Sequence, residues 1–267
     1  MANDFSKISS YYDQKAVVQQ SASGKLFDLV KIRPEDDVLD IGCGTGQLTQ
    51  KIRNFTNGRV AGIDPSPGMI ETAVRNNTRP GLVFEESSAE SLCCENEFDT
   101  VISNSAFQWF KNPELVLRNI HRALRPGGRI GMQAPARKNY CPNFIDAVER
   151  VASDPRTRES FRHFVSPWIF LETAEEYKDL FRKAGFYVHF SEIEEVTTFH
   201  TPVELQGIFS SAALAAYLNQ DYYSIPVGKE YERRFMEIVE DAFARQAGPD
   251  GEVALTFFRV YLLADKL

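Results

Sequence analysis

The stretch Val38-Leu39-Asp40-Ile41-Gly42-Cys43-Gly44-Thr45-Gly46 decides the fold. Its first four residues are mostly apolar and predict a buried strand, and the three glycines at every second position predict a tight turn into a helix. Glycine is needed where the backbone bends sharply or lies against a ligand, because a Cβ atom would clash there. The unpaired N–H groups at the start of the helix face the same crevice and favour a polar or anionic ligand group. We therefore expect a cofactor on this turn.

A carboxylate further along the chain supports this interpretation. The next predicted strand, 59–63, ends in Asp64, which follows Gly44 by 20 residues. At this spacing, a carboxylate at the end of the second strand can bind both hydroxyls of an adenosine ribose. Dinucleotide oxidoreductases use the spacing Gly-x-Gly-x-x-Gly, whereas residues 42–46 have Gly-x-Gly-x-Gly and Gln47 follows. The motif therefore argues against a nicotinamide or flavin dinucleotide.

Strands and helices alternate along residues 36–134, which is typical of a parallel sheet covered by helices on both faces. We expect strands at 37–41, 59–63, 82–85, 98–103 and 129–134, and helices at 46–55, 67–76 and 113–124. The later pattern predicts helices at 143–153, 173–185, 202–218 and 227–246, and strands at 186–193 and 256–264. No regular element is predicted between 154 and 171. Ligands in such sheets bind at the carboxyl ends of the strands, where Gly42, Asp64 and Asn104 lie.

Composition narrows the classes of function. The chain has 267 residues, 43% of them hydrophobic and 12% aromatic, which is enough for one packed core with a lid. Its net charge of -7 disfavours binding to nucleic acid. The four cysteines show no Cys-x-x-Cys spacing, and no apolar run reaches the roughly 18 residues that cross a membrane. We expect a cytoplasmic protein without nucleic-acid or membrane partners, and the sequence does not predict its oligomeric state.

Five motifs in the expected order carry a resemblance to a known family. They are the stretch 38–46, Gly62-Ile63-Asp64, Ser88-Ala89-Glu90, Phe98-Asp99-Thr100-Val101-Ile102-Ser103-Asn104, and Leu124-Arg125-Pro126-Gly127-Gly128-Arg129. With these motifs the chain resembles the class I S-adenosylmethionine-dependent methyltransferases. The stretches Asn104-Ser105-Ala106-Phe107-Gln108-Trp109 and Tyr11-Tyr12-Asp13-Gln14-Lys15-Ala16 are similar to the trans-aconitate and malonyl-carrier-protein carboxyl methyltransferases within that family.

The resemblance implies an α/β fold with a Rossmann-like, doubly wound, seven-stranded sheet, mostly parallel with an antiparallel last strand, plus a helical lid. The expected domains are an N-terminal helical cap (1–30), the S-adenosylmethionine-binding core (31–135), a lid insertion (136–172), a core helix and strand (173–195), a helical lid insertion (196–248) and a final core strand (249–267).

The resemblance also assigns roles around the cofactor. Asp40 would hold the ammonium group of S-adenosylmethionine directly or through water, and Asp64 would bind the ribose hydroxyls. Met69 and Ile63 would flank the adenine. Ser88 stands where the family usually has an acidic residue, so the backbone of Ala89 is the alternative partner of the adenine edge. The full set of expected cofactor-binding residues is Asp40, Gly42, Cys43, Gly44, Gly46, Asp64, Pro65, Met69, Ser88, Ala89, Glu90 and Asn104.

Methyl transfer is an in-line displacement at a sulfonium, so the protein mainly aligns two molecules in a water-poor site, and no metal is needed. Gln108 and Trp109 carry N–H donors that can satisfy both oxygens of a buried carboxylate, which points to an organic acid as acceptor. Arg137 could bind a second anionic group, and Tyr11 or Tyr12 could close over the methyl donor. In the alternative, Trp109 anchors the core, Gln108 and Arg137 lie in solvated loops, and the tyrosines only pack.

The type of acceptor stays open at this point. A carboxylic acid with a pKa of roughly 4 is already ionised at neutral pH, so the chain need not supply a general base. A hydroxyl, amine or carbon acceptor is the second hypothesis, with the aromatic residues only shaping the pocket. A module that binds the cofactor without turnover is the third, because a fold can host many functions.

Overall fold

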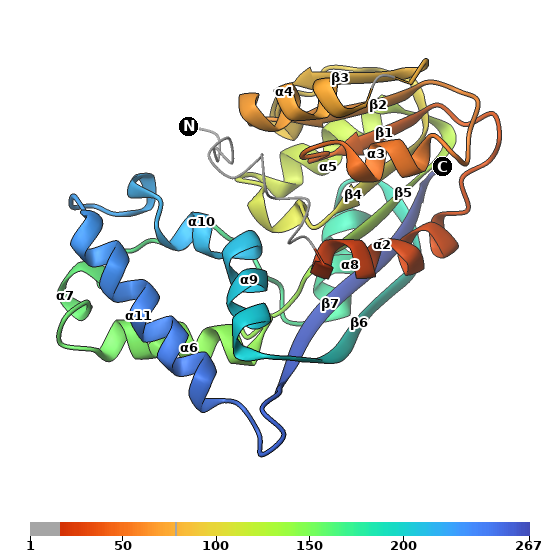
Figure 1. Cartoon of the computed structure of the whole chain (residues 1–267). Coiled ribbons are helices and arrows are strands. Elements are labelled where there is room, and N and C mark those ends of the chain that lie inside the picture. Colours follow the sequence, from red (N-terminus) through yellow and green to blue (C-terminus); the bar gives the residue numbers. More distant parts are fainter. Residues whose placement is uncertain (1–16, 78) are drawn as a thin grey trace. The chain divides into compact units, whose positions relative to one another are not determined.

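One mixed sheet organises the computed structural model, which describes residues 17–77 and 79–267. Its seven strands have the order β3-β2-β1-β4-β5-β7-β6, and β7 pairs antiparallel with β5 whereas the pairs among β1 to β5 are parallel (Figure 1). The strands are β1 (Val38–Ile41), β2 (Val60–Asp64), β3 (Leu82–Glu86), β4 (Phe98–Asn104), β5 (Leu124–Pro135), β6 (Phe186–His200) and β7 (Val253–Lys266). The predicted fold class is confirmed.

Alternation of side chains along the central strands gives the sheet two apolar faces. Val38 belongs to a buried cluster with residues of α2 (Val17–Val30) and α3 (Gln47–Ile52). Its neighbour Leu39 belongs to another cluster, with residues of α5 (Pro113–Ala123) and α8 (Ala174–Lys183). Helices therefore cover both faces, as a doubly wound sheet requires.

The described residues divide into two compact units. One comprises the chain up to Lys138, Trp168–Glu194 and Arg259–Leu267, and includes α4 (Pro67–Asn76), η1 (Ala89–Ser91) and η2 (Phe107–Trp109). The other comprises Asn139–Pro167 and Glu195–Phe258. Its elements include α6 (Pro142–Ser153), α7 (Arg158–Phe161), α9 (Pro202–Ala212), α10 (Leu214–Tyr217), η3 (Gln220–Tyr222) and α11 (Lys229–Arg245). Among the described residues, no helix is long and apolar enough to cross a membrane.

The second unit has an aromatic core of its own. The Phe144 ring lies 5.0 Å from the Phe209 ring and 5.9 Å from the Phe243 ring, and Tyr217 stacks on Phe209 at 6.0 Å. Offset and edge-on ring pairs of this kind add to the stabilisation from apolar burial. The segment predicted as one helix at 202–218 is two, because the backbone of Ala213, with φ of -117°, separates α9 from α10.

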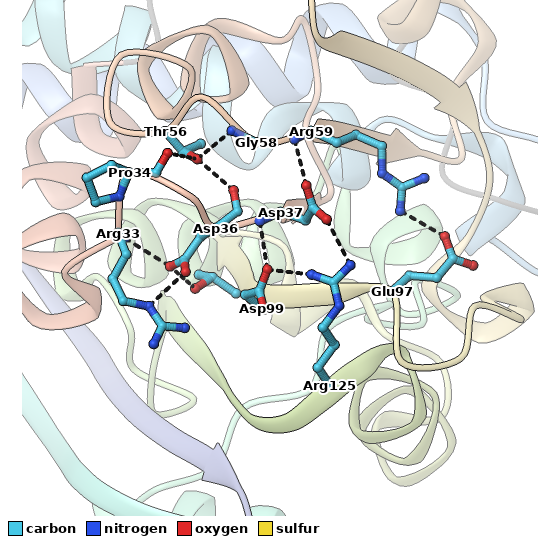
Figure 2. Close-up of polar contacts among 11 residues, drawn as sticks. Arg33, Pro34, Asp36, Asp37, Thr56, Gly58, Arg59, Glu97, Asp99 and Arg125 are labelled. Atoms are coloured by element: carbon cyan, nitrogen blue, oxygen red, sulfur yellow. Dashed lines mark hydrogen bonds and ion pairs between the residues drawn. The ribbon is translucent and has the colours of Figure 1, made fainter.

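A charged network joins the amino ends of the strands (Figure 2). The Arg125 guanidinium donates to Asp37 Oδ2 at 2.8 Å and to Asp99 Oδ2 at 2.5 Å. The backbone N–H of Asp37 also donates to Asp99 Oδ2, and that of Arg59 donates to Asp37 Oδ1. These contacts tie together the approaches to β1 and β2 and the first residues of β4 and β5. The carboxyl ends of the same strands lie at the other edge of the sheet, where the candidate site forms.

Candidate active site

The glycine turn after β1 adopts a backbone that side chains rarely allow. Gly42, Gly44 and Gly46 have φ values of 74°, 53° and 80°. A Cβ atom on Gly42 would collide with that of Ala106, and one on Gly46 would lie 2.7 Å from the Phe84 ring. A Cβ atom on Gly44 would meet nothing within 4 Å, so at this residue the backbone faces open space. The turn therefore packs tightly at its ends and presents its middle to a ligand.

A cavity of about 390 Å³ opens beside this turn. Among the described residues, its wall is formed by Ile41, Gly42, Gly44, Ile63, Asp64, Pro65, Met69, Ser87, Ser88, Ala89, Glu90, Asn104, Ser105, Ala106, Trp109, Phe110 and Lys111. These residues come from the carboxyl ends of β1, β2 and β4 and the segments that follow them, from α4 and from the segment after β3. The volume lies in the range of small-molecule and cofactor pockets.

Asp64, at the end of β2, is fixed by two backbone groups. Its Oδ2 accepts from the N–H of Gly44 at 3.0 Å and its Oδ1 accepts from that of Ser66 at 2.9 Å. Burial raises the pKa of Asp64, and the two hydrogen bonds oppose that rise. Each carboxylate oxygen keeps a further acceptor site. Asp64 thus stands on the cavity wall with the capacity that ribose hydroxyls require.

Asp40 lies beneath the turn and does not belong to the wall. It is 1% exposed, and its Oδ2 accepts from Thr49 Oγ1 at 2.7 Å. Burial, together with the nearby Asp64, raises the pKa of Asp40 to about 7. Cys43 and Gly46 also lie outside the wall, and burial raises the pKa of the Cys43 thiol. Any effect of Asp40 on a cationic ligand must therefore act across the turn or through water.

The segment after β3 forms the part of the wall expected to meet adenine. Ser88 Oγ accepts from the N–H of Ser91 at 3.2 Å, and the Asn119 amide donates to the carbonyls of Ala89 and Glu90 at 3.1 and 2.8 Å. Glu90 Oε1 accepts from the N–H of Lys111 at 2.9 Å. Ile63, Pro65 and Met69 add apolar surface to the same wall. The described residues thus fit an adenosine: an apolar surface, fixed backbone groups and the Asp64 carboxylate.

Only some of the residues predicted to bind the acceptor line the cavity. Trp109 lines the cavity, as does Asn104, which was predicted to bind the cofactor, whereas Gln108 is 7% exposed and does not line it. The Gln108 amide donates to the carbonyl of Ser105 at 2.8 Å. Arg137 is also absent from the wall, and its N–H donates to the carbonyl of Leu171 at 2.9 Å. The predicted tyrosines, Tyr11 and Tyr12, lie outside the described residues.

Sequence reasoning missed four residues of the same loop. Ser105, Ala106, Phe110 and Lys111 all line the cavity. Their signal was their position in the run from Asn104 to Asn112, at the end of β4, where the sequence pattern had singled out only Asn104, Gln108 and Trp109. Lys111 is a cation on the wall, a role that the sequence had suggested for Arg137.

Comparison with known proteins finds similarity to methyltransferases. A family model described as "Methyltransferase domain" matches residues 39–132. A malonyl-[acyl-carrier protein] O-methyltransferase of Hahella chejuensis is 36% identical over 49% of this chain, and the match spans 47% of that relative's length. A trans-aconitate 2-methyltransferase of Methylobacterium nodulans is 28% identical, with 85% of each chain covered.

The fold also matches solved structures. The methyltransferase in a complex with the Haloferax volcanii Trm112 methyltransferase activator has a TM-score of 0.62, with 18% identity, 100% of this chain covered and 99% of that one. The predicted resemblance to methyltransferases of this class is confirmed.

Proposed function

We propose that this chain, which carries a class I S-adenosylmethionine-dependent methyltransferase domain, methylates a carboxylate of a small organic acid. The observation that carries the proposal is that Trp109 lines the same cavity as Gly44 and Asp64. An indole N–H donor beside a cofactor pocket suits an anionic acceptor. The names of the relatives, which concern a malonyl carrier protein and trans-aconitate, support an acid as acceptor.

In this proposal the chain supplies alignment, binding and exclusion of water. When bound, S-adenosylmethionine supplies a methyl group on a sulfonium. Asp64 accepts the ribose hydroxyls, and Ile63 and Met69 pack on the adenine. Trp109 donates to one oxygen of the acceptor carboxylate, which is ionised at neutral pH and needs no base. The apolar wall around Phe110 keeps water from the reacting atoms, so that the two reactants meet in line.

Transfer of label tests the proposal. The protein is incubated with methyl-labelled S-adenosylmethionine and trans-aconitate, a malonyl thioester on its carrier protein, or a small-molecule cell extract. Mild base releases a methyl ester as volatile methanol, so we expect base-labile label. Label that transfers but survives base would instead support a hydroxyl, amine or carbon acceptor. Cofactor binding without any transfer would support a non-catalytic module.

Two tryptophan variants test the donor. Trp109→Phe keeps an aromatic ring and removes the N–H, and we expect kcat/KM for the acid to fall about 10- to 100-fold, which corresponds to the loss of a hydrogen bond to a charged group. Trp168→Phe is the matched control, because the Trp168 ring lies 5.4 Å from that of Trp109 but does not line the cavity. Equal turnover by wild type and Trp109→Phe would remove Trp109 from this role.

A further inference from the structure

Ser105 holds a strained position on the cavity wall. It follows β4 directly, and its φ of 58° lies in the left-handed region that residues with a side chain seldom adopt. Such conformations persist only where the surroundings fix them, and they gather at functional sites. The conformation accompanies the close approach of Ala106 to Gly42, where an added Cβ atom would collide. The loop after β4 and the glycine turn are therefore fitted to each other at this residue.

Two glutamines hold the polar groups of Ser105. Its N–H donates to the carbonyl of Gln133 at 2.8 Å, and its Oγ donates to Gln133 Oε1 at 2.9 Å. Its carbonyl accepts from Gln108 Nε2 at 2.8 Å. Gln133 is 2% exposed and Gln108 is 7% exposed, so both side-chain amides form these hydrogen bonds shielded from bulk water. Ser105 thus lines the cavity, and its hydroxyl is hydrogen-bonded to the buried amide of Gln133.

We propose that Ser105 recognises the acceptor, with its hydroxyl donating to the acceptor carboxylate and Gln133 supporting it from behind. This inference rests on the proposed carboxylate methylation and names a residue of the same site. A glutamine amide offers an acceptor at one end and donors at the other. When the acid binds, the Ser105 hydroxyl hydrogen turns from Gln133 Oε1 to the carboxylate, and the amide turns so that Nε2 donates to Ser105 Oγ. No proton leaves either residue.

Gln108 acts through Ser105 in this arrangement and is a positioning residue. Its side-chain Nε2 donates to the Ser105 carbonyl, and its backbone carbonyl accepts from the N–H of Ile169 at 2.9 Å. Gln108 thereby joins the loop after β4 to the segment that carries Trp168, whose ring contacts Trp109. The pair of donors facing the acceptor is then Ser105 and Trp109, with Gln108 holding both in place from behind the wall.

Two variants of Ser105 separate recognition from strain. Ser105→Ala and Ser105→Gly both remove the hydroxyl, but glycine adopts φ of 58° without strain, whereas alanine keeps the strain that serine has there. We expect both to raise KM for the acid by about tenfold or more, with the dissociation constant of S-adenosylmethionine changed less than about threefold. Their melting temperatures should diverge, with Ser105→Gly above Ser105→Ala. The probe is trans-aconitate or, where that acid is not methylated, the extract fraction that gives base-labile label.

A double variant tests the positioning residue. Gln108→Met removes the donor to the Ser105 carbonyl and should lower kcat, whereas in the Ser105→Gly background it should add little, because residues that act as a unit are not additive. An unchanged KM in both Ser105 variants, or a KM that rises only in the less stable one, overturns the role of Ser105 while ester formation by wild type still stands. Absence of base-labile label from wild type overturns the proposed function itself, and the Ser105 assignment with it.

Discussion

Replacing Asp40 by asparagine should make the protein more stable and a poorer binder of its cofactor. Asp40 is buried, and burial raises its pKa from the ordinary 3.8 to about 7. Between these two pH values the unfolded chain has lost the proton while the folded chain keeps it, so stability falls as pH rises and levels off above about pH 7. Each pKa unit is about 1.4 kcal/mol, so the ionised Asp40 costs the folded state up to roughly 4 kcal/mol.

Asparagine removes this pH dependence without removing the local contact, because its Oδ1 can accept from Thr49 Oγ1 as Asp40 does. We expect Asp40→Asn to match wild type near pH 4 and to exceed it by up to about 4 kcal/mol near pH 8. Urea unfolding across this pH range measures the difference. Parallel stability curves for the two proteins would contradict the origin assigned to the high pKa of Asp40.

Cofactor affinity should move in the opposite direction. S-adenosylmethionine carries an ammonium and a sulfonium, and a cation near Asp40 favours the ionised carboxylate. Wild-type affinity should therefore rise with pH through about 7, whereas Asp40→Asn should bind about tenfold or more weakly near pH 8 and show little pH dependence. Titration calorimetry gives both curves. Equal affinity of the two proteins near pH 8 would exclude a role for the Asp40 charge in binding.

Two further predictions concern the turn and the charged network. Gly44→Ala puts a methyl group into the cavity at a φ of 53°, so it should weaken S-adenosylmethionine binding at least tenfold and lower the free energy of unfolding by about 1 kcal/mol. Gly42→Ala, whose Cβ atom meets Ala106, should lower the free energy of unfolding more. Calorimetry measures the binding and denaturant unfolding the stability; a greater loss of stability in Gly44→Ala than in Gly42→Ala would contradict this prediction. Burial raises the pKa of Asp37, but hydrogen bonds from Arg125 and Arg59 outweigh burial and lower this pKa below its ordinary value. The Asp37 carboxylate therefore stabilises the fold above about pH 4, and its contribution decreases as the pH falls. Arg125→Met should therefore lower the free energy of unfolding by about 1 kcal/mol near pH 7, because the partners are partly exposed, and by much less near pH 3. An equal loss of stability at both pH values would count against a contribution from the ion pairs.

The side of the cavity formed by the glycine turn and Asp64 was largely readable from the sequence, because each of its features has a local cause. A glycine is the residue that tolerates the positive φ at position 44, and a strand followed by Asp64 puts a carboxylate at a sheet edge whatever the rest of the chain does. The strands of the sheet were predictable for the same reason, because a short run of apolar residues by itself indicates a buried strand. The break at Ala213 was missed because alanine favours helix and nothing local interrupts the pattern.

The loop after β4 was harder to read because neighbours in sequence point in different directions. Gln108 and Trp109 lie in η2, a 3₁₀ helix with three residues per turn, so their side chains leave the axis about 120° apart. Trp109 therefore lines the cavity while Gln108 turns back to the Ser105 carbonyl. Gln133 reaches the same loop from β5, a contact across 28 residues that no local pattern records. Where such contacts position the residues that line the cavity, the choice of acceptor depends on buried residues such as Gln133 and Gln108 as well as on the lining residues themselves.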